Sequence, residues 1–398
     1  MSFRPVFVLG LARSGTNLLA RMLDRHPRIA VALDPFMPLF RALRNAAVRS
    51  LAPAPVQARF RPDSPFQDYY FDADGPALLD ALLGGDARLA IQEDEVVRLR
   101  RGCAERAALE SRELGGRMGE LVGRDHAALL ESGLRIVATM RPGAAWVGCK
   151  EVWIYDFVPM LARAFPQARF YAIERDPRAI VASLAAMAKD DPTQSAHAPS
   201  YVRHWRKSVA LARRYEADPS LSQRFRSICY ERMVIEPEAE ARRVCDELGV
   251  SFTPGMLDLS ADGWRGNSSY TDVGTGVYSA SSERWRTELP EDSLRTVDFL
   301  CGPEMSLTGY RPTGEEAFGS EVLRDLEHAS RQPGSWRSDS GDTLVDLGGE
   351  LVRHALLETR DNSDTRLVRR CFLFTETFEA IMRARSRDRS ARDEAGSR

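Results

Sequence analysis

The sequence of 398 residues predicts an α/β fold: a parallel sheet flanked by helices, with a helical insertion and a helical C-terminal extension. Two patterns carry this prediction. The chain opens as an apolar strand, a glycine-bounded turn and a helix, which together form the front half of a βαβ unit. Short apolar runs then alternate with helical patterns, and this alternation favours a parallel sheet that is covered on both faces.

The predicted elements follow in order along the chain. Strands are expected over residues 5–10, 145–149, 169–173 and 225–230, and helices over 156–165, 179–188, 201–215 and 238–248. Residues 35–141 begin with prolines and aromatics and continue as mixed-charge helical patterns, so they form a helical insertion. A loop rich in Gly, Ser and Thr spans residues 262–282, and a further helix begins near Glu291.

These patterns divide the chain into three regions. Residues 1–315 form one α/β domain that contains the insertion, and residues 316–384 form a helical C-terminal extension. Residues 385–398 alternate charged residues with Ser and Ala, so we predict a disordered tail there.

Composition and charge exclude several classes of protein. Hydrophobic residues make up 43% of the chain and charged residues 28%, which is ordinary globular composition. Lys plus Arg number 55 against 57 for Asp plus Glu, a net charge of −2. No overall basic field exists to hold a nucleic acid or an anionic membrane, so any anion site must be local.

The six cysteines are scattered, with no C-x-x-C pair and no Cys/His cluster at zinc spacing. Neither a disulfide framework nor a structural metal is indicated, and a reducing cytoplasm is the simplest compartment. The apolar run over residues 6–12 is interrupted by Arg13 and is too short to span a membrane.

Residues 10–17, Gly-Leu-Ala-Arg-Ser-Gly-Thr-Asn, have the glycine spacing of a P-loop and follow a strand as a P-loop must. Backbone N–H groups and the helix N-terminus can wrap a phosphate there, which predicts a P-loop-type sheet. A nucleoside triphosphate site requires Lys and then Ser or Thr at the last two positions, but this chain has Thr16 and Asn17. Two parts that phosphoryl transfer needs are therefore missing.

Residues 5–19, which include this loop, resemble the 5′-phosphosulfate loop of sulfotransferases that use PAPS (3′-phosphoadenosine 5′-phosphosulfate). The continuation Leu23-Asp24-Arg25-His26-Pro27 is similar to the branch that contains tyrosylprotein sulfotransferases and related bacterial enzymes. The resemblance covers residues 3–312, with the insertion loosely accounted for. It implies that the donor is bound by Ala12, Arg13, Ser14, Gly15, Thr16 and Asn17.

Residues 174–183 resemble the family's 3′-phosphate motif. Arg175 ends a strand at the sheet edge where a crevice opens, and Ser183 lies two turns into the next helix, so both can converge on one phosphate. The alternative is that Arg175 pairs with a neighbouring acid and Ser183 only packs. The resemblance also implies that Tyr230 contacts the adenine and that Arg284 binds a phosphate.

Sulfuryl transfer needs a base and positive charge beside the leaving oxygen, and the resemblance implies that no metal takes part. Asp34 falls close to where the tyrosylprotein branch carries its catalytic Glu, so it is the candidate base, although Asp-Pro is also a common turn initiator. Lys150 follows a strand and suits a point contact on an oxyanion. Arg13 can share that role, and Glu151 is the alternative base.

The predicted function is transfer of the sulfuryl group of PAPS to a hydroxyl of a small molecule, glycan or peptide. A P-loop kinase of a small metabolite and a non-catalytic nucleotide-binding protein stay open as alternatives. The insertion is expected to cap the acceptor side, with Phe36 and one of residues 69–71 lining an apolar pocket. The alternative is that these aromatics form the insertion's own core.

Overall fold

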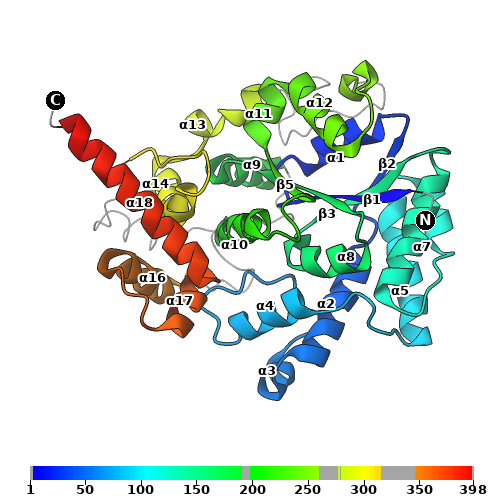
Figure 1. Cartoon of the computed structure of the whole chain (residues 1–398), viewed down its shortest axis with the longest axis horizontal. Helices are drawn as coiled ribbons and strands as arrows, with labels where there is room; N and C mark the ends of the chain where they lie inside the picture. The colour runs from blue at the N-terminus through cyan, green and yellow to red at the C-terminus, as the bar shows by residue number, and fades with distance from the viewer. Residues whose placement is uncertain (1–2, 191–197, 260–276, 278, 315–345, 397–398) are drawn as a thin grey trace. The chain divides into compact units, whose positions relative to one another are not determined.

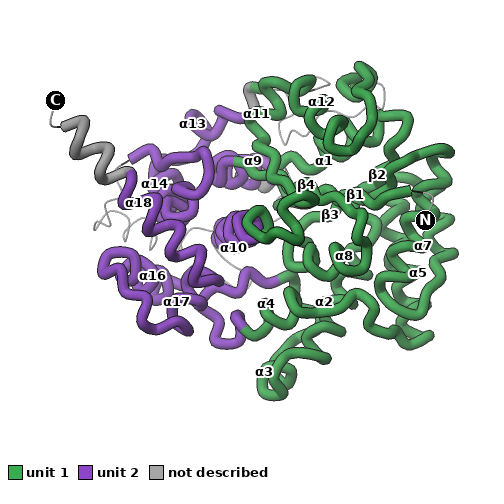
Figure 2. The backbone as a smooth tube through the Cα atoms, in the orientation of Figure 1, with its two compact units in different colours: residues 1–66, 77–175, 215–281 green, residues 67–76, 176–214, 282–398 purple. Residues whose placement is uncertain are grey.

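The computed structural model describes residues 3–190, 198–259, 277, 279–314 and 346–396 (Figure 1). The chain forms two compact units (Figure 2). Unit 1 comprises Met1–Phe66, Ala77–Arg175 and Tyr215–Ser281, and unit 2 comprises Gln67–Pro76, Asp176–Arg214 and Ser282–Arg398. This division differs from the predicted one, because unit 2 combines the C-terminal extension with segments of the predicted α/β domain.

Unit 1 is built on a parallel five-stranded sheet of order β2-β3-β1-β4-β5. The strands are β1 (Arg4–Gly10), β2 (Ile29–Leu33), β3 (Trp146–Val152), β4 (Arg169–Glu174) and β5 (Phe225–Cys229). Four of them match the prediction, whereas β2 adds an edge strand that the sequence analysis misses. Strand β3 also runs farther than predicted, so Lys150 and Glu151 lie inside it.

Both faces of the sheet are covered, because side chains on both faces of the strands are apolar. On one face, Val6 and Tyr171 belong to a buried cluster shared with helices α1 (Thr16–Asp24), α11 (Tyr230–Ile235) and α12 (Pro237–Leu248). On the other face, Phe7 stacks on Phe170 with ring centroids 5.4 Å apart and contacts Phe165. The predicted parallel α/β fold is therefore confirmed.

The chain between β2 and β3 forms the predicted helical insertion. Its helices are α2 (Met37–Leu51), α3 (Ala54–Arg59), α4 (Gly75–Gly84), α5 (Glu93–Ala108), α6 (Arg112–Met118) and α7 (His126–Thr139). A 3-10 turn, η1 (Ile154–Phe157), and helix α8 (Val158–Ala164) then lead from β3 to β4. Inside unit 1, Phe40 and Phe66 both contact Phe157, with ring centroids 5.3 and 5.7 Å apart.

The described residues of unit 2 are mainly helical. Its elements are α9 (Pro177–Asp190), most of α10 (Ala198–Ala217), α13 (Trp285–Glu288), α14 (Glu291–Met305), α16 (Leu347–Thr359), α17 (Thr365–Phe372) and α18 (Thr375–Gly396), and the 3-10 turn η4 (Ser279–Ser282) ends at Ser282, where the last segment of this unit begins. In unit 1, η2 (Pro254–Leu257) follows α12. Helix α18 reaches Gly396 where the sequence predicts a tail from residue 385. Most of the predicted loop 262–282 and the polar break at 332–342 lie outside the described residues.

Buried charges join the C-terminal helices to the rest of unit 2. Arg206 of α10, with 0% exposure, donates two hydrogen bonds to the carboxylate of Glu350 on α16, at 2.7 and 2.8 Å. Arg353 of α16 pairs with Glu304 of α14 in the same interior. A buried ion that loses its partner is costly. These pairs therefore explain why the extension belongs with α10 and α14 in one compact unit.

Candidate active site

The loop between β1 and α1 contains two residues with a left-handed backbone. Arg13 has a φ of 70° and Gly15 a φ of 100°. The backbone N–H and the hydroxyl of Ser14 both donate to the carbonyl oxygen of Leu11, at 3.1 and 2.7 Å, and close the turn. Successive N–H groups in such a turn, followed by a helix N-terminus, form a concave site for an anion.

Two predicted donor-site residues pack against this loop within unit 1. Arg175, immediately after β4, donates from Nη1 to the carbonyl oxygen of Arg13 at 2.8 Å. Its guanidinium carbon lies 4.2 Å from the ring centroid of Tyr230. The Tyr230 ring in turn covers Gly15, where a Cβ would come within 2.3 Å of it. The loop, the end of β4 and the end of β5 therefore meet at one edge of the sheet.

Tyr230, which the resemblance places against the adenine, is buried. The side chain is 1% exposed, with Arg175 over its ring and Gly15 against its edge. Tyr230 therefore supports the loop backbone and the guanidinium.

Asp34 and Lys150 form an ion pair at the ends of β2 and β3. Lys150 is 3% exposed and Asp34 is 24% exposed. The register brings them together, because Leu33 pairs with Lys150 and the N–H of Asp34 donates to the Lys150 carbonyl oxygen at 2.8 Å. Asp34 has a φ of 48°, and its Oδ1 is buried without a hydrogen-bond partner among the described residues.

Glu151 is fully buried beside this pair. Its Oε1 accepts a hydrogen bond from the backbone N–H of Phe36. Burial raises the pKa of the Glu151 carboxyl well above its usual value, and the charge of Asp34 raises it further. The Phe36 N–H and the Lys150 ammonium oppose this shift.

A family model described as the sulfotransferase family matches residues 5–254, the region that contains the loop, the Asp34–Lys150 pair and Arg175. The chain belongs to the sulfotransferase family. Human carbohydrate sulfotransferase 6 is 27% identical over 203 residues, which cover 44% of this chain and 51% of the relative. Human carbohydrate sulfotransferase 3 is 28% identical over 166 residues, covering 36% and 33%. This sulfotransferase thus spans about half or less of the length of these curated relatives.

Two solved structures also match this sulfotransferase. The sulfotransferase domain of the Synechococcus PCC 7002 olefin synthase is 16% identical, with a TM-score of 0.42. The match covers 83% of this chain and 96% of that chain. The sulfotransferase domain from the curacin biosynthetic pathway is 14% identical, with a TM-score of 0.42 over 83% and 98%.

Ser183 and Arg284, two further predicted donor residues, belong to unit 2 of the sulfotransferase. Ser183 is 3% exposed on α9. Arg284 lies at the start of α13, with its Nη1 3.8 Å from Oε1 of Glu288. In the same unit the neighbouring Trp285 is buried, with the guanidinium carbon of Arg178 4.0 Å from its ring centroid.

Two residues next to the sequence-predicted motifs were not singled out from the sequence. Arg178 pairs with Asp176 at 2.7 Å and with Asp298 at 3.3 Å. A second Arg within residues 174–178 was the sequence feature that could have pointed to Arg178. Trp153 follows β3 with a φ of 68°, and its N–H donates to the carbonyl oxygen of Gly10 at 3.0 Å. No sequence pattern indicates a left-handed backbone at a bulky residue, which is a rare conformation.

The aromatics predicted to line an acceptor pocket are buried. Phe36 has 0% exposure and packs on Gly133, where a Cβ would lie 2.3 Å from the ring. Tyr69, Tyr70 and Phe71 belong to unit 2 and are 2%, 5% and 9% exposed. These rings are therefore buried in cores, which was the alternative to a pocket-lining role.

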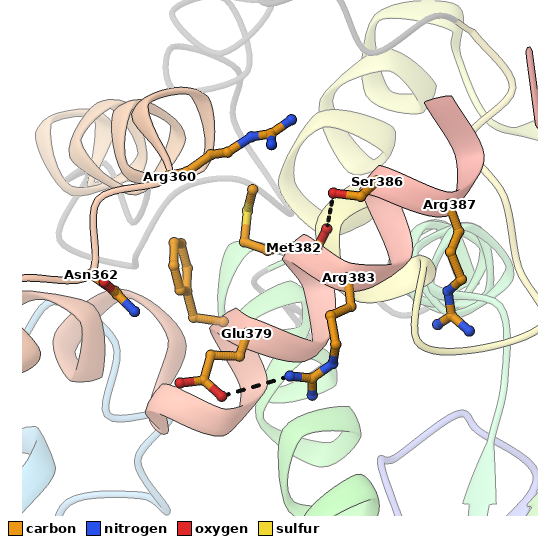
Figure 3. A pocket seen from close by; sticks show the side chains of 8 residues that line it. Arg360, Asn362, Glu379, Met382, Arg383, Ser386 and Arg387 are labelled. Atoms are coloured by element: carbon orange, nitrogen blue, oxygen red, sulfur yellow. Dashed lines mark hydrogen bonds and ion pairs between the residues drawn. The ribbon is translucent and has the colours of Figure 1, made fainter. Parts of the chain in front are cut away.

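A cavity of about 660 Å³ lies in the C-terminal helices of unit 2 (Figure 3). It is lined by Arg360, Asn362, Phe378, Glu379, Met382, Arg383, Ser386 and Arg387. Figure 3 shows Arg383 directed to Glu379, with which it forms an ion pair of 3.7 Å. None of the predicted site residues lines this cavity.

The described residues lack both a group of side chains suited to a metal ion and a helix suited to a membrane. They contain no group of three or more His, Cys, Asp or Glu side chains placed to hold a metal ion. Among them, no helix combines the length and the apolar character that crossing a membrane requires.

Proposed function

We propose that this sulfotransferase moves the sulfuryl group of PAPS to an acceptor hydroxyl by metal-independent, in-line transfer. The observation that carries this proposal is the packing of Arg175 and Tyr230 against the loop of residues 10–17. It supports a site with a phosphate-binding loop and a buried guanidinium at one sheet edge, the place where open α/β sheets bind ligands.

The residues present fit the two anionic ends of PAPS. Backbone N–H groups from Ala12 to Asn17 would hold the 5′-phosphosulfate, and the buried Oδ1 of Asn17, which has no partner among the described residues, adds a polar contact point. Arg175 would hold the 3′-phosphate. When bound, PAPS supplies an activated sulfuryl group, and charge develops on its 5′-phosphate as that group departs.

Asp34, Lys150 and Arg13 would perform the chemistry. Oδ1 of Asp34 is the carboxylate oxygen left over from the pair with Lys150, and it would take the proton of the acceptor hydroxyl. The Lys150 ammonium and the Arg13 guanidinium would counter the charge on the leaving oxygen. The Asp34 carboxylate offsets part of the cost of burying the Lys150 ammonium before the donor arrives.

A carbohydrate hydroxyl is the acceptor class with the most support. The curated relatives are named carbohydrate sulfotransferases. The aromatics that favoured an apolar pocket are buried in cores. Hydroxyls of small molecules and peptides share the same chemistry and belong in the same assay.

The six cysteines are free thiols, which supports a reducing compartment such as the cytoplasm.

Calorimetry of the full chain tests the donor. We expect PAP, the desulfated product of PAPS, to bind without metal and ATP to bind weakly with or without Mg²⁺. A panel of carbohydrate, peptide and phenol acceptors with labelled PAPS then tests transfer. Mg²⁺-dependent ATP turnover would replace the proposal with a kinase, and PAP binding without transfer to any acceptor class would favour a non-catalytic protein.

A further inference from the structure

The turn that carries Asp34 is strained. Asp34 has a positive φ of 48° and precedes Pro35, and a residue before proline is normally restricted to extended conformations. Such a backbone costs about 1 to 3 kcal/mol and persists only where its surroundings hold it. The position of the candidate base therefore depends on the contacts that fix this turn.

Strand β3 fixes the turn on both sides of Pro35, which has no N–H of its own. Before it, the Asp34 N–H donates to the Lys150 carbonyl oxygen at 2.8 Å and the Asp34 carboxylate pairs with the Lys150 ammonium. After it, the Phe36 N–H donates to Oε1 of Glu151. Glu151 supplies the contact on the far side of the turn.

Lys150 and Glu151 are consecutive strand residues, so their side chains point to opposite faces of the sheet. Glu151 and Cys149 lie two residues apart on β3, so their side chains share one face of the sheet. Phe36, at the start of the insertion, contacts Glu151 on that face. The ends of β3 thus present a cation on one face and a fully buried acid on the other.

Two cations lie near Glu151, Lys150 and Arg106; both lower its pKa, but burial and the charge of Asp34 have the larger, raising effects. Lys150 is paired with Asp34, and Arg106 of α5 donates instead to the Asp34 carbonyl oxygen at 3.4 Å. Cys103 of α5 is a neutral thiol whose pKa burial raises to about 12, and burial raises the pKa of Cys149 as well. Oε2 of Glu151 is buried without a hydrogen-bond partner among the described residues.

We infer that Glu151 is a positioning residue, an uncharged buried acid that pins the Asp34–Phe36 turn through the Phe36 N–H and so aims the Asp34 carboxylate. An ionised carboxylate with one hydrogen bond, beside the Asp34 charge and near cations that contact Asp34 instead, is costly to bury, whereas a protonated acid keeps the acceptor oxygen that the turn needs. The direction of the Glu151 pKa agrees with this protonation. The inference rests on the proposed function, because it takes Asp34 as the base.

Three variants of the full chain separate positioning from catalysis. Glu151→Gln keeps the acceptor for the Phe36 N–H, Glu151→Leu removes it at similar volume, and Asp34→Asn removes the candidate base. With PAPS and an accepted acceptor, we expect kcat to fall about threefold in Glu151→Gln and about 30-fold or more in Glu151→Leu, with the KM for PAPS little changed. The pH–rate profile of Glu151→Gln should keep the wild-type shape.

Two readouts need no activity and therefore distinguish failure of this inference from failure of the proposed function. Infrared spectra at neutral pH should show the C=O band of a buried protonated acid that Glu151→Gln loses and Asp34→Asn keeps. Hydrogen exchange should show the Phe36 amide protected in the wild type and Glu151→Gln, and at least about tenfold faster in Glu151→Leu.

Other outcomes overturn the inference. If Glu151→Gln abolishes turnover while Asp34→Asn does not, Glu151 is the base. If the infrared band is absent from the wild type or survives in Glu151→Gln, the acid is ionised or another residue carries the proton. If the Phe36 amide exchanges equally in all three proteins, Glu151 does not pin the turn.

Discussion

Arg175 donates a hydrogen bond of 2.8 Å to the carbonyl oxygen of Arg13 and so ties the end of β4 to the loop after β1. Arg13 is one of the few non-glycine residues with a positive φ, so its backbone needs such a tether. A planar guanidinium fork can in general donate to a backbone carbonyl and to a phosphate together.

Arg175→Ala should weaken PAP binding by about 1.5 to 3 kcal/mol, roughly 10- to 150-fold, because one charge-assisted contact is lost. Adenosine 5′-phosphosulfate lacks the 3′-phosphate and should lose much less. Calorimetry with both ligands measures the difference. An equal loss for both ligands would leave Arg175 as a brace for the loop only.

Asp34→Asn should leave PAP affinity nearly intact while turnover falls about 100-fold or more, the range of a positioned general base. The amide keeps the size and a hydrogen-bonding group of the side chain but cannot take the acceptor proton. Steady-state kinetics and PAP calorimetry on one preparation supply both numbers. Unchanged turnover would mean that Asp34 only shapes the turn before Pro35.

Asp34 and Lys150 should couple in stability. Lys150→Met leaves the Asp34 carboxylate without its partner, so the single variant loses about 1 to 3 kcal/mol of unfolding free energy, and Asp34→Asn added to it recovers part of that loss. Urea unfolding of the two single variants and the double variant gives the coupling. The exposed pair Arg101 and Glu105 is the control, and it should show little coupling. Strict additivity at Asp34 and Lys150 would argue against a functional ion pair.

Gly15→Ala should be among the most damaging single-methyl changes in the donor loop. The backbone there has a φ of 100°, and the new Cβ would meet the Tyr230 ring at 2.3 Å. We expect a stability loss of about 1 to 3 kcal/mol and at least tenfold weaker PAP binding. Gly143→Ala is the matched control, since its φ of 85° is also positive and no described atom beyond its chain neighbours lies within 4 Å of the added Cβ. Similar thermal shifts in both variants would refute the close packing of Tyr230 on Gly15.

Glu151→Gln should gain stability relative to the wild type as the pH rises. The raised pKa of Glu151 means that the folded protein holds a proton that the unfolded chain releases above about pH 4.3. Between that value and the raised folded pKa, wild-type stability falls by about 1.4 kcal/mol per pH unit, and Gln lacks this dependence. The Tm difference should be constant below about pH 4 and shift in favour of Glu151→Gln toward neutral pH. A flat difference would mean that Glu151 is ionised in the fold.

Local pattern was sufficient for part of the site. The glycines of the loop, its place between an apolar strand and a helix, and the position of Arg175 at a strand end are all short-range features, so they are legible along the chain. Family resemblance then supplied their meaning, and the match over residues 5–254 agrees with it. The edge strand β2 was missed although Ile29–Leu33 is an apolar run, because a five-residue run carries little periodicity.

The sequence alone therefore determined the fold class and the place of the loop of residues 10–17, because strand and helix periodicities and glycine spacing are local, and the resemblance of its motifs indicated the family. Tertiary structure decided what depends on residues distant in the chain. The register of β2 on β3 pairs Asp34 with Lys150, and the turn after β2 buries Glu151 against the Phe36 N–H. Packing also placed the aromatics of the insertion in cores and joined the C-terminal helices to α10 through Arg206 and Glu350. Burial and ion pairing are properties of the whole fold, and no spacing along the chain encodes them.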